Sequence, residues 1–265
     1  MTTGSTFKHL LKTHRLYPVV AALVLLILWE AVVVGFNIGT WLLPRPSAVL
    51  AACITSAARL LPAAWVTAQE ILIGFFLSVT IGILVAVAIV SNKVVEESSY
   101  PLLVSSQLVP KIAIAPILTT WFGFGMAPKV TMCFLISFFP MVIDSIVGLR
   151  SVPIGKLQLA LTMGASRRQL FTKIRLPNAL PNIFGGMKIA STLAVVGALV
   201  GEFISSDQGL GRVMLLANGD FNAALLFAAI AYLTVIGLIL YAIIELLERL
   251  LIPWHVSRRA EAHGQ

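Results

Sequence analysis

Six apolar stretches, each about as long as a bilayer is thick, constrain this chain more than any other feature of its sequence. They are predicted to be helices at 17–36, 71–90, 102–122, 130–147, 183–200 and 223–244. An α-helix needs about 20 residues to cross the hydrocarbon core. Pro110, Pro116 and Pro140 do not exclude these spans, because neighbouring helices can satisfy the freed carbonyls. The sequence therefore predicts an all-α, polytopic membrane protein with six transmembrane helices.

The composition agrees with this interpretation and excludes other classes. Of the 265 residues, 58% are hydrophobic and only 11% are charged. An ordinary soluble domain has about 45–50% apolar and about 25% charged residues. The length favours one domain, placed at 17–250 between tails at 1–16 and 251–265. Cys53 and Cys133 form no metal-binding pattern and cannot build a disulfide framework.

The distribution of Lys and Arg predicts the orientation of the spans. With the amino terminus inside, fourteen lie in cytoplasmic segments: Lys8, Lys12, Arg15, Lys93, Arg150, Lys156, Arg167, Arg168, Lys173, Arg175, Lys188, Arg249, Arg258 and Arg259. Four lie outside: Arg45, Arg59, Lys129 and Arg212. Positive charge collects on the cytoplasmic side of membrane proteins, so both termini are expected in the cytoplasm. The net charge of +8 therefore reports orientation and not nucleic-acid binding.

The first span has a second interpretation, as a signal peptide. Its apolar run is long for that purpose and contains Glu30, and no clear small-residue cleavage site follows it. We therefore expect it to be a retained transmembrane helix.

The predicted cytoplasmic loop at about 150–182 has the most specific local pattern. An apolar helical segment is expected to end at Gly164, because glycine most easily takes a positive φ. Ser166 is then placed as an N-cap, and Gln169 three residues later completes a capping box. The second short helix is expected to end at Pro177. The loop is thus predicted to be a rigid knob, suited either to a groove on a cytoplasmic partner or to contact with lipid headgroups.

Spacing within this loop resembles a known signature. Gly164 is followed by nine residues and then by Ile174-Arg175-Leu176-Pro177, which is similar to the G-x9-I-x-L-P core of the EAA motif. That motif marks permease subunits of type I ABC importers. Gln158 stands where the motif has its glutamate, so the acidic residue is missing here.

Three other segments resemble one branch of that family, the nitrate/sulfonate/taurine permeases. They are Leu42–Leu50, Pro110–Gly125 and Gly201–Gly211. The resemblance covers about 29–251 and implies a MetI-like permease fold in a bacterial inner membrane. It further implies a small solute, anionic or of the vitamin-precursor type.

The resemblance also implies partners for the chain. Two permease subunits, expected to be identical, would enclose the path, and a periplasmic or surface-tethered binding protein would deliver the solute. A separate ATPase would receive the coupling loop. The residues expected to transmit force to it are Gly164, Ala165, Ser166, Arg167, Arg168, Leu176 and Pro177.

No G-x-x-x-x-G-K-[ST] phosphate loop occurs in the sequence. The chain is therefore expected to be non-catalytic and to have no cofactor of its own, with ATP and Mg²⁺ bound by the ATPase. His9, His14, His255 and His263 all lie in the tails, and no catalytic or metal site is predicted.

Ionisable residues in or near spans are the candidates for the substrate path, since charge is costly in a bilayer. Lys111 lies between two prolines and could meet solute, or could pair with Glu70 or Glu202. Glu202, at the end of the fifth span, could shape a gate or meet the binding protein. Asp144 is expected to pair with Arg150 or Lys188.

Small residues in the fifth span allow close helix packing. Gly197 and Gly201 form a GxxxG pattern that Gly186, Ala190 and Ala194 continue. The pattern fits either the axis of a dimer or packing within one chain.

The alternative function is a secondary transporter driven by an ion gradient. It would have inverted repeats with paired broken helices. A membrane enzyme is disfavoured, because no polar catalytic cluster is present.

Overall fold

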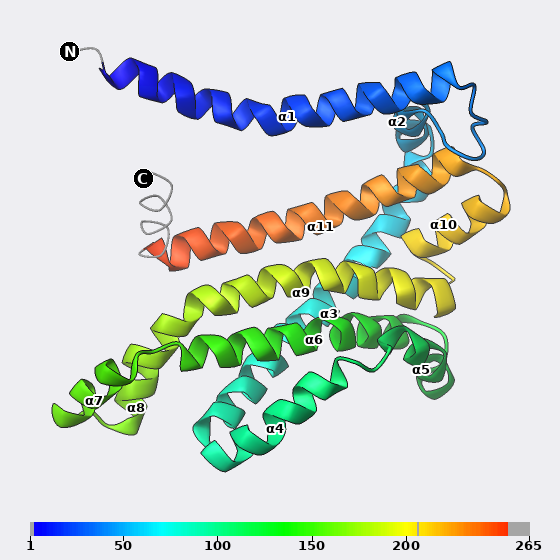
Figure 1. Cartoon of the computed structure of the whole chain (residues 1–265). Helices are drawn as coiled ribbons and strands as arrows, with labels where there is room; N and C mark the ends of the chain where they lie inside the picture. Colours follow the sequence, from blue (N-terminus) through cyan, green and yellow to red (C-terminus); the bar gives the residue numbers. More distant parts are fainter. Residues whose placement is uncertain (1–2, 206, 254–265) are drawn as a thin grey trace. The chain divides into compact units, whose positions relative to one another are not determined.

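The computed structural model describes residues 3–205 and 207–253, and every regular element among them is helical. In chain order the elements are α1 (Thr3–Gly35), α2 (Pro46–Thr55), α3 (Ala57–Ser91), α4 (Lys93–Ser106), η1 (Lys111–Ile114), α5 (Ala115–Phe122), α6 (Met126–Arg150), α7 (Ile154–Thr162), α8 (Arg167–Leu170), η2 (Phe171–Arg175), α9 (Leu176–Ser205), α10 (Leu210–Gly219) and α11 (Ala223–Leu251) (Figure 1). The described part of the predicted tail at 1–16 is helical, and 254–265 lie outside the described residues.

Five of the six predicted spans each lie in one helix, to within one residue at the end of the first, and the third covers a break between helices. Four helical runs are long and apolar enough to cross a bilayer: α3, α6, α8 to α9 as one run over Arg167–Ser205, and α11. The described apolar part of α1, Val19–Gly35, is shorter than these. The all-α membrane architecture is therefore confirmed, with four of the six spans complete by length and composition.

The third predicted span is a broken one. Its two parts, Val94–Ser106 and Lys111–Phe122, meet at an angle of 81°. A residue before proline avoids the helical region of backbone space, so a helix tends to end ahead of Pro110. The break therefore places Lys111 at the start of the short helical turn η1.

The chain divides into two compact units, which we describe separately. The first comprises 1–61 and 213–231, and the second comprises 62–212 and 232–265. In the first unit Glu30 of α1 accepts hydrogen bonds from the backbone N–H (3.0 Å) and hydroxyl (2.8 Å) of Ser47. No side chain caps α2 from Arg45, its own N-cap position, so Glu30 supplies an acceptor for the first turn of α2.

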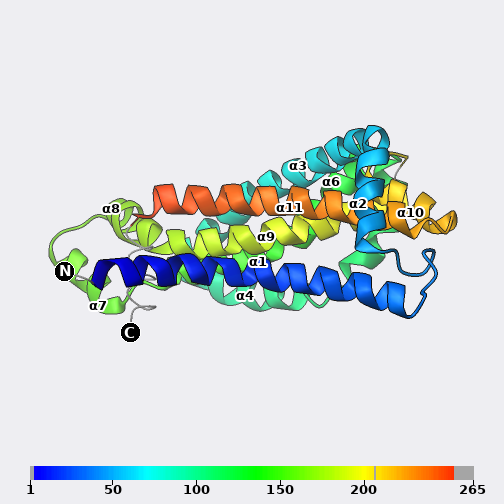
Figure 2. The same ribbon diagram turned by 90° about the horizontal axis from the view of Figure 1, so that it is seen from above.

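In the second unit α6 packs closely against both α3 and α9. The α6 and α9 ribbons run side by side in two perpendicular views (Figures 1 and 2). A Cβ atom at Gly197 would lie 2.6 Å from the Cα of Cys133, and one at Gly201 would lie 2.9 Å from the Cα of Lys129. Where α6 contacts α3, the hydroxyls of Ser78 and Ser137 are 2.6 Å apart. The GxxxG pattern therefore serves packing within one chain.

The expected partners of Asp144 are engaged elsewhere, so that prediction is wrong. Arg150 pairs with Glu96 at the start of α4, and the Lys188 ammonium lies 2.5 Å from Glu248 of α11. The Asp144 side chain instead lies against Gly186, where α6 and α9 approach closely. Sequence distance along a span does not reveal which neighbouring helix supplies the opposite charge.

Candidate functional site

The segment from Gly164 to Pro177, which we call the coupling loop, has the local structure that its sequence predicts. α7 ends at Thr162, and Gly164 has φ +82°. The Ser166 backbone N–H donates to Oε1 of Gln169 (2.8 Å), and the Gln169 N–H donates to the Ser166 hydroxyl (3.3 Å). The predicted capping box is therefore confirmed, and it fixes the start of α8.

The end of this segment differs from the prediction. Pro177 does not stop the helix, because α8 continues through the π-helical turn η2 into α9, which begins at Leu176. The π-helical turn just before Pro177 departs from the regular i to i−4 hydrogen-bond pattern, and this accommodates a residue that has no backbone N–H. The helical run is therefore continuous from Arg167 to Ser205.

The surface of α7 and the coupling loop is both apolar and basic. Large apolar side chains stand in solvent, with Met163 at 79%, Ile154 at 72% and Leu159 at 64% exposure. Within the described residues, four cations of α8 and η2 have no ion-pair partner: Arg167, Arg168, Lys173 and Arg175. Contiguous exposed apolar surface with a polar rim is typical of an interaction site.

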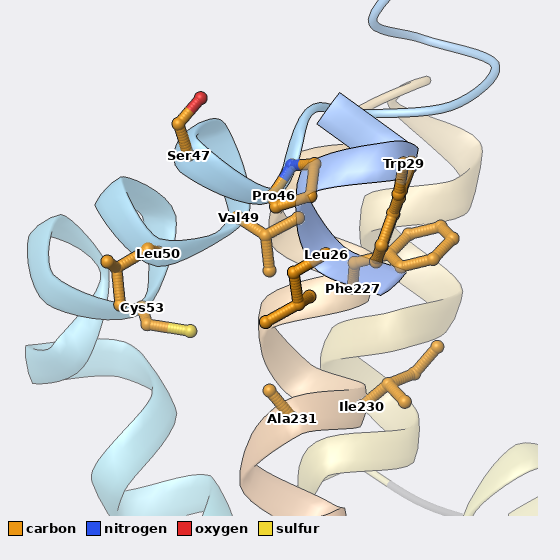
Figure 3. Close-up of a pocket in the computed structure, with 10 residues that line it drawn as sticks. All are labelled: Leu26, Trp29, Pro46, Ser47, Val49, Leu50, Cys53, Phe227, Ile230 and Ala231. Carbon is orange, nitrogen blue, oxygen red and sulfur yellow. The ribbon is translucent and has the colours of Figure 1, made fainter. Parts of the chain in front are cut away.

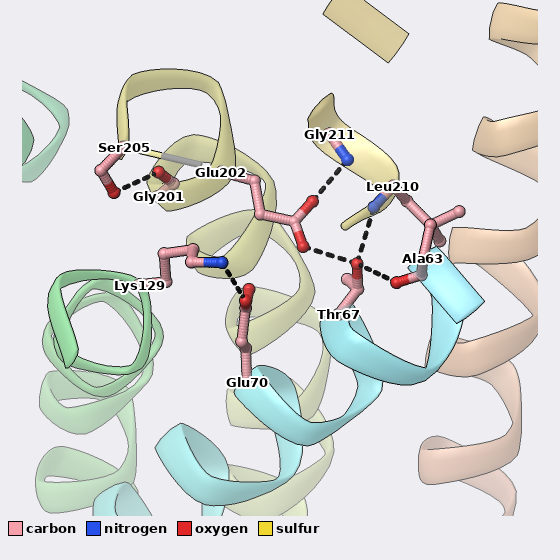
Figure 4. A network of polar contacts seen from close by, with 9 residues as sticks. All are labelled: Ala63, Thr67, Glu70, Lys129, Gly201, Glu202, Ser205, Leu210 and Gly211. Carbon is pink, nitrogen blue, oxygen red and sulfur yellow. Dashed lines mark hydrogen bonds and ion pairs between the residues drawn. The ribbon is translucent and has the colours of Figure 1, made fainter. Parts of the chain in front are cut away.

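At the opposite end of α9, a buried polar cluster joins α3, α6, α9 and α10 (Figure 4). We call it the Glu202 network; its members are Thr67, Glu70, Lys129, Glu202, Leu210 and Gly211. The Lys129 ammonium lies 2.5 Å from Oε1 of Glu70, and both side chains are almost fully buried. An ion pair out of water is stable only when its geometry is close and its neighbours are polar.

Glu202 holds the turn that leads into α10. Its Oε1 accepts the hydroxyl of Thr67 (2.6 Å), and its Oε2 accepts the backbone N–H of Gly211. The Thr67 hydroxyl also accepts the N–H of Leu210 at 2.9 Å. The first N–H groups of α10, which no helical carbonyl can satisfy, thus bond to α3 and α9.

Sequence reasoning placed Glu202 in the substrate path but did not identify Thr67 or Lys129. The sequence predicts Lys129 in an outer segment, whereas the structure places it as the fourth residue of α6, where it is only 4% exposed. The available signal was the Thr67-x-x-Glu70 spacing, which puts both side chains on one face of a helix. Within the part of the chain that the structure describes, Lys111 forms no ion pair with Glu70 or Glu202, and Lys129 pairs with Glu70 instead.

Lys111 lies beside an aromatic surface. Its ammonium is 5.0 Å from the ring centroid of Phe139 and 3.5 Å from the backbone oxygen of Gln107. Phe138 lies 5.2 Å from Phe139 and 5.1 Å from Phe134, ring centroid to centroid. These rings are half-buried on α6, so the broken third span and α6 together present a cation and flat apolar faces.

Two cavities differ in chemistry. One, of about 300 Å³ in the second unit, is polar and is lined in part by Gln69, Lys129 and Asp207. The other, of about 520 Å³ in the first unit, is lined almost wholly by apolar side chains such as Leu26 and Phe227 (Figure 3). A polar solute would find few hydrogen-bond partners in the second cavity.

No set of three or more His, Cys, Asp or Glu side chains within 3–205 and 207–253 could hold a metal ion. The described residues thus include a buried polar cluster at one end of α9 and an exposed apolar and basic surface at the other.

Comparison with known proteins relates this arrangement to transport. The formylaminopyrimidine transport permease protein ThiX of Halalkalibacterium halodurans is 38% identical over 246 residues, covering 91% of this chain and 96% of the relative. The taurine transport system permease protein TauC of Escherichia coli is 30% identical, covering 88% and 87%. Each of these two relatives therefore aligns with most of the chain, and the taurine permease belongs to the branch that the sequence resembles.

The fold has a counterpart among solved structures. A chain of the MetNI methionine ABC transporter, in inward-facing conformations, aligns with a TM-score of 0.64 at 18% identity, covering 74% of this chain and 97% of that one. This likeness supports the MetI-like fold. Residues 78–253 match the family model described as the binding-protein-dependent transport system inner membrane component. The chain therefore belongs to this family, the membrane-spanning permease subunits of ABC importers.

Proposed function

We propose that this permease subunit takes its driving force from a separate ATPase, which it engages through the coupling loop. The residues assigned to this contact are Gly164, Ala165, Ser166, Arg167, Arg168, Leu176 and Pro177. The observation that carries the assignment is the capped, exposed segment at Ser166, where cations without an ion-pair partner among residues 3–205 and 207–253 lie beside exposed apolar side chains. Such a surface is suited to a complementary groove on a partner.

The continuity of the helix supports a mechanical role. A displacement at Arg167 is transmitted along one helical run to Ser205, because no loop interrupts it. ATP and Mg²⁺ bind to the ATPase in this proposal, and the permease is not itself an enzyme. The gradient-driven alternative is not favoured, since the relatives named above are ABC permeases or transport permeases of that family.

Two identical permease subunits enclose the path in this proposal, and a binding protein delivers the solute. The coupling loop and both termini face the cytoplasm of a bacterial cell, in agreement with the excess of Lys and Arg in these segments. The Glu202 network then lies at the outer side, near the turn that the binding protein would approach.

For the solute we propose a small, flat vitamin precursor, with a small sulfonate as the second candidate. The relative named for a formylaminopyrimidine is 38% identical and the relative named for taurine is 30% identical. Lys111 beside Phe139 is the substrate-path candidate that fits a planar ring, since an aromatic face and a cation both bind such a solute. Glu202 is better suited to positioning than to solute contact, because both its oxygens are already bonded.

The test compares one substitution at two glycines. Gly164→Val places a β-branched residue at φ +82°, which such residues strongly disfavour, whereas Gly155→Val lies in α7 with open space around it. Both variants are expressed with the ATPase and binding protein encoded nearby. We expect Gly164→Val to lose ATP-driven uptake, or ATPase co-purification, at normal membrane levels, and Gly155→Val to keep both.

Equal uptake in the two variants would refute the assignment of the coupling loop. If no ATPase co-purifies even with the unaltered chain, the proposed partnership itself fails. Competition between an aminopyrimidine and taurine for uptake then separates the two solute classes.

A further inference from the structure

A groove with an apolar floor and a basic rim lies where α3 and α6 end. Its volume is about 860 Å³, and its walls come from the ends of α3 and α6, the start of α4, and the segments α7, α8 and η2. All of these belong to the second unit. The functions assigned to the coupling loop do not require a cavity behind it.

The floor of the groove is made of side chains that a soluble surface would normally bury. Val87 and Val90 at the end of α3, Leu157 of α7, and Leu170 and Phe171 of the α8–η2 segment are all half-buried and line it. Val90 lies one residue before the end of the span α3, and Leu149 lies one residue before the end of α6. The floor is therefore continuous with the ends of two helices that are long and apolar enough to cross a bilayer.

The rim carries an excess of positive charge. Arg150 and Glu96 pair with each other there and cancel. Arg167 and Arg175 add two more guanidinium groups, and neither has an ion-pair partner in the described part of the chain. Guanidinium groups bind phosphate through two parallel hydrogen bonds, so two unpaired arginines beside an apolar floor complement a phosphate that carries acyl chains.

The backbone of η2 puts two of these side chains in the groove. Phe171 begins this π-helical turn and Arg175 ends it. π-Helical turns are rare and are frequently found at functional sites. Lys173, in the middle of the same turn, is exposed and does not line the groove.

We infer that this groove binds an anionic phospholipid of the cytoplasmic leaflet, with its phosphate at Arg167 and Arg175 and an acyl chain on the floor. Basic pockets between helices on the cytoplasmic side are typical sites for anionic headgroups. The inference rests on the proposed cytoplasmic location of the coupling loop. It gives the loop a second contact, with lipid, beside its contact with the ATPase.

The test titrates the purified permease–ATPase complex, in a neutral detergent, with short-chain phosphatidylglycerol, short-chain phosphatidylcholine or glycerol 3-phosphate. We expect phosphatidylglycerol to bind most tightly, because only it combines a net negative charge with chains. Arg175→Gln should weaken phosphatidylglycerol binding about tenfold, which is the loss of one charge-assisted contact. Lys173→Gln removes the same charge two residues away and should change binding less than twofold.

Leu157→Gln tests the contribution of the apolar floor independently of the basic rim. It should weaken phosphatidylglycerol and leave glycerol 3-phosphate unaffected, since it disturbs only the chain contact. Equal binding of phosphatidylcholine, or equal losses in Arg175→Gln and Lys173→Gln, would overturn the inference. Binding of glycerol 3-phosphate as tight as that of the lipid would replace it with a soluble-anion site.

Titration of the permease without the ATPase distinguishes this inference from the proposed function. If phosphatidylglycerol binds the permease alone but not the complex, the groove is part of the ATPase interface and the lipid site is refuted. If no ATPase co-purifies, the proposed coupling fails, while the lipid titration of the permease alone still decides the inference.

Discussion

The Glu202 network and the coupling loop lie at opposite ends of one helical run, and they treat charge in opposite ways. In the network Lys129 is 4% exposed and Glu202 is 1% exposed, and each has a partner within the chain. In the coupling loop Arg167 and Arg168 are exposed and have no ion-pair partner in the described residues. The first region fixes the positions of helices, and the second is suited to binding something outside the chain.

The difference has an energetic basis. A buried charge that loses its partner retains the full cost of removal from water, whereas an exposed charge is already hydrated. Substitutions in the Glu202 network should therefore reduce stability, and substitutions in the coupling loop should reduce transport without reducing stability.

The largest expected effect is at Lys129. Lys129→Met leaves Glu70 buried without its ammonium partner, and should reduce the free energy of unfolding by about 3–5 kcal/mol. Thermal unfolding in detergent measures the loss. Lys173→Met, an exposed cation of the coupling loop, should stay within about 0.5 kcal/mol of the unaltered protein. The double variant Lys129→Met, Glu70→Gln should recover part of the lost stability. If Lys129→Met and Lys173→Met melted at the same temperature, the predicted difference between the buried and the exposed cation would be wrong.

The next effect concerns close packing between α6 and α9. Gly197→Ala puts a methyl group 2.6 Å from the Cα of Cys133, so the helices must separate, at a cost of about 1–3 kcal/mol. Gly155→Ala, which has nothing within 4 Å, should be neutral or stabilising, since alanine favours a helix more than glycine does. Thermal unfolding of the two variants checks this, and a stable Gly197→Ala protein would contradict the packing described for α9.

A smaller effect is expected at Thr67. Thr67→Val removes the donor to Glu202 and the acceptor of the Leu210 N–H, and should cost about 1–2 kcal/mol. Limited proteolysis at the turn before α10 should also become faster, because α10 loses its anchor. Thr162→Val is the control, since its hydroxyl bonds only to the backbone oxygen of Gln158 at an exposed site. Unchanged proteolysis in Thr67→Val would show that Glu202 alone holds the turn.

The smallest effect is expected for the pair between Glu96 and Arg150. The Arg150 side chain is 44% exposed, so solvent screens the interaction, and Glu96→Gln should cost about 0–1 kcal/mol. Glu245→Gln, which breaks the exposed pair with Arg249, should behave alike. If Glu96→Gln lowered the free energy of unfolding by more than about 2 kcal/mol, the pair would behave as a buried ion pair and not as an exposed one.

The sequence was informative where structure is local. Ser166 and Gln169 are three residues apart, so their capping box follows from the order of residues alone. The positive φ of Gly164 is equally local, and the six apolar stretches follow from composition. These features depend on neighbours in the chain, which a sequence displays directly.

The Glu202 network could not be found in this way. Thr67 and Glu202 are 135 residues apart, and only the packing of α3, α6 and α9 brings them together. The same holds for Asp144, whose expected partners were taken by Glu96 and Glu248. The continuation of the helix past Pro177 was missed because a π-helical turn has no simple residue pattern.

The π-helical turn η2 determines how α8 is rotated about the helix axis relative to α9. η2 contains more residues per turn than an α-helix, and each residue of an α-helix advances the next by about 100°. The side of α8 that faces outward is therefore determined, relative to α9, by a single residue of extra length. Deletion of one residue within 171–175 would leave every side chain from Gly164 to Leu170 intact and yet present a different face of α8 to any partner.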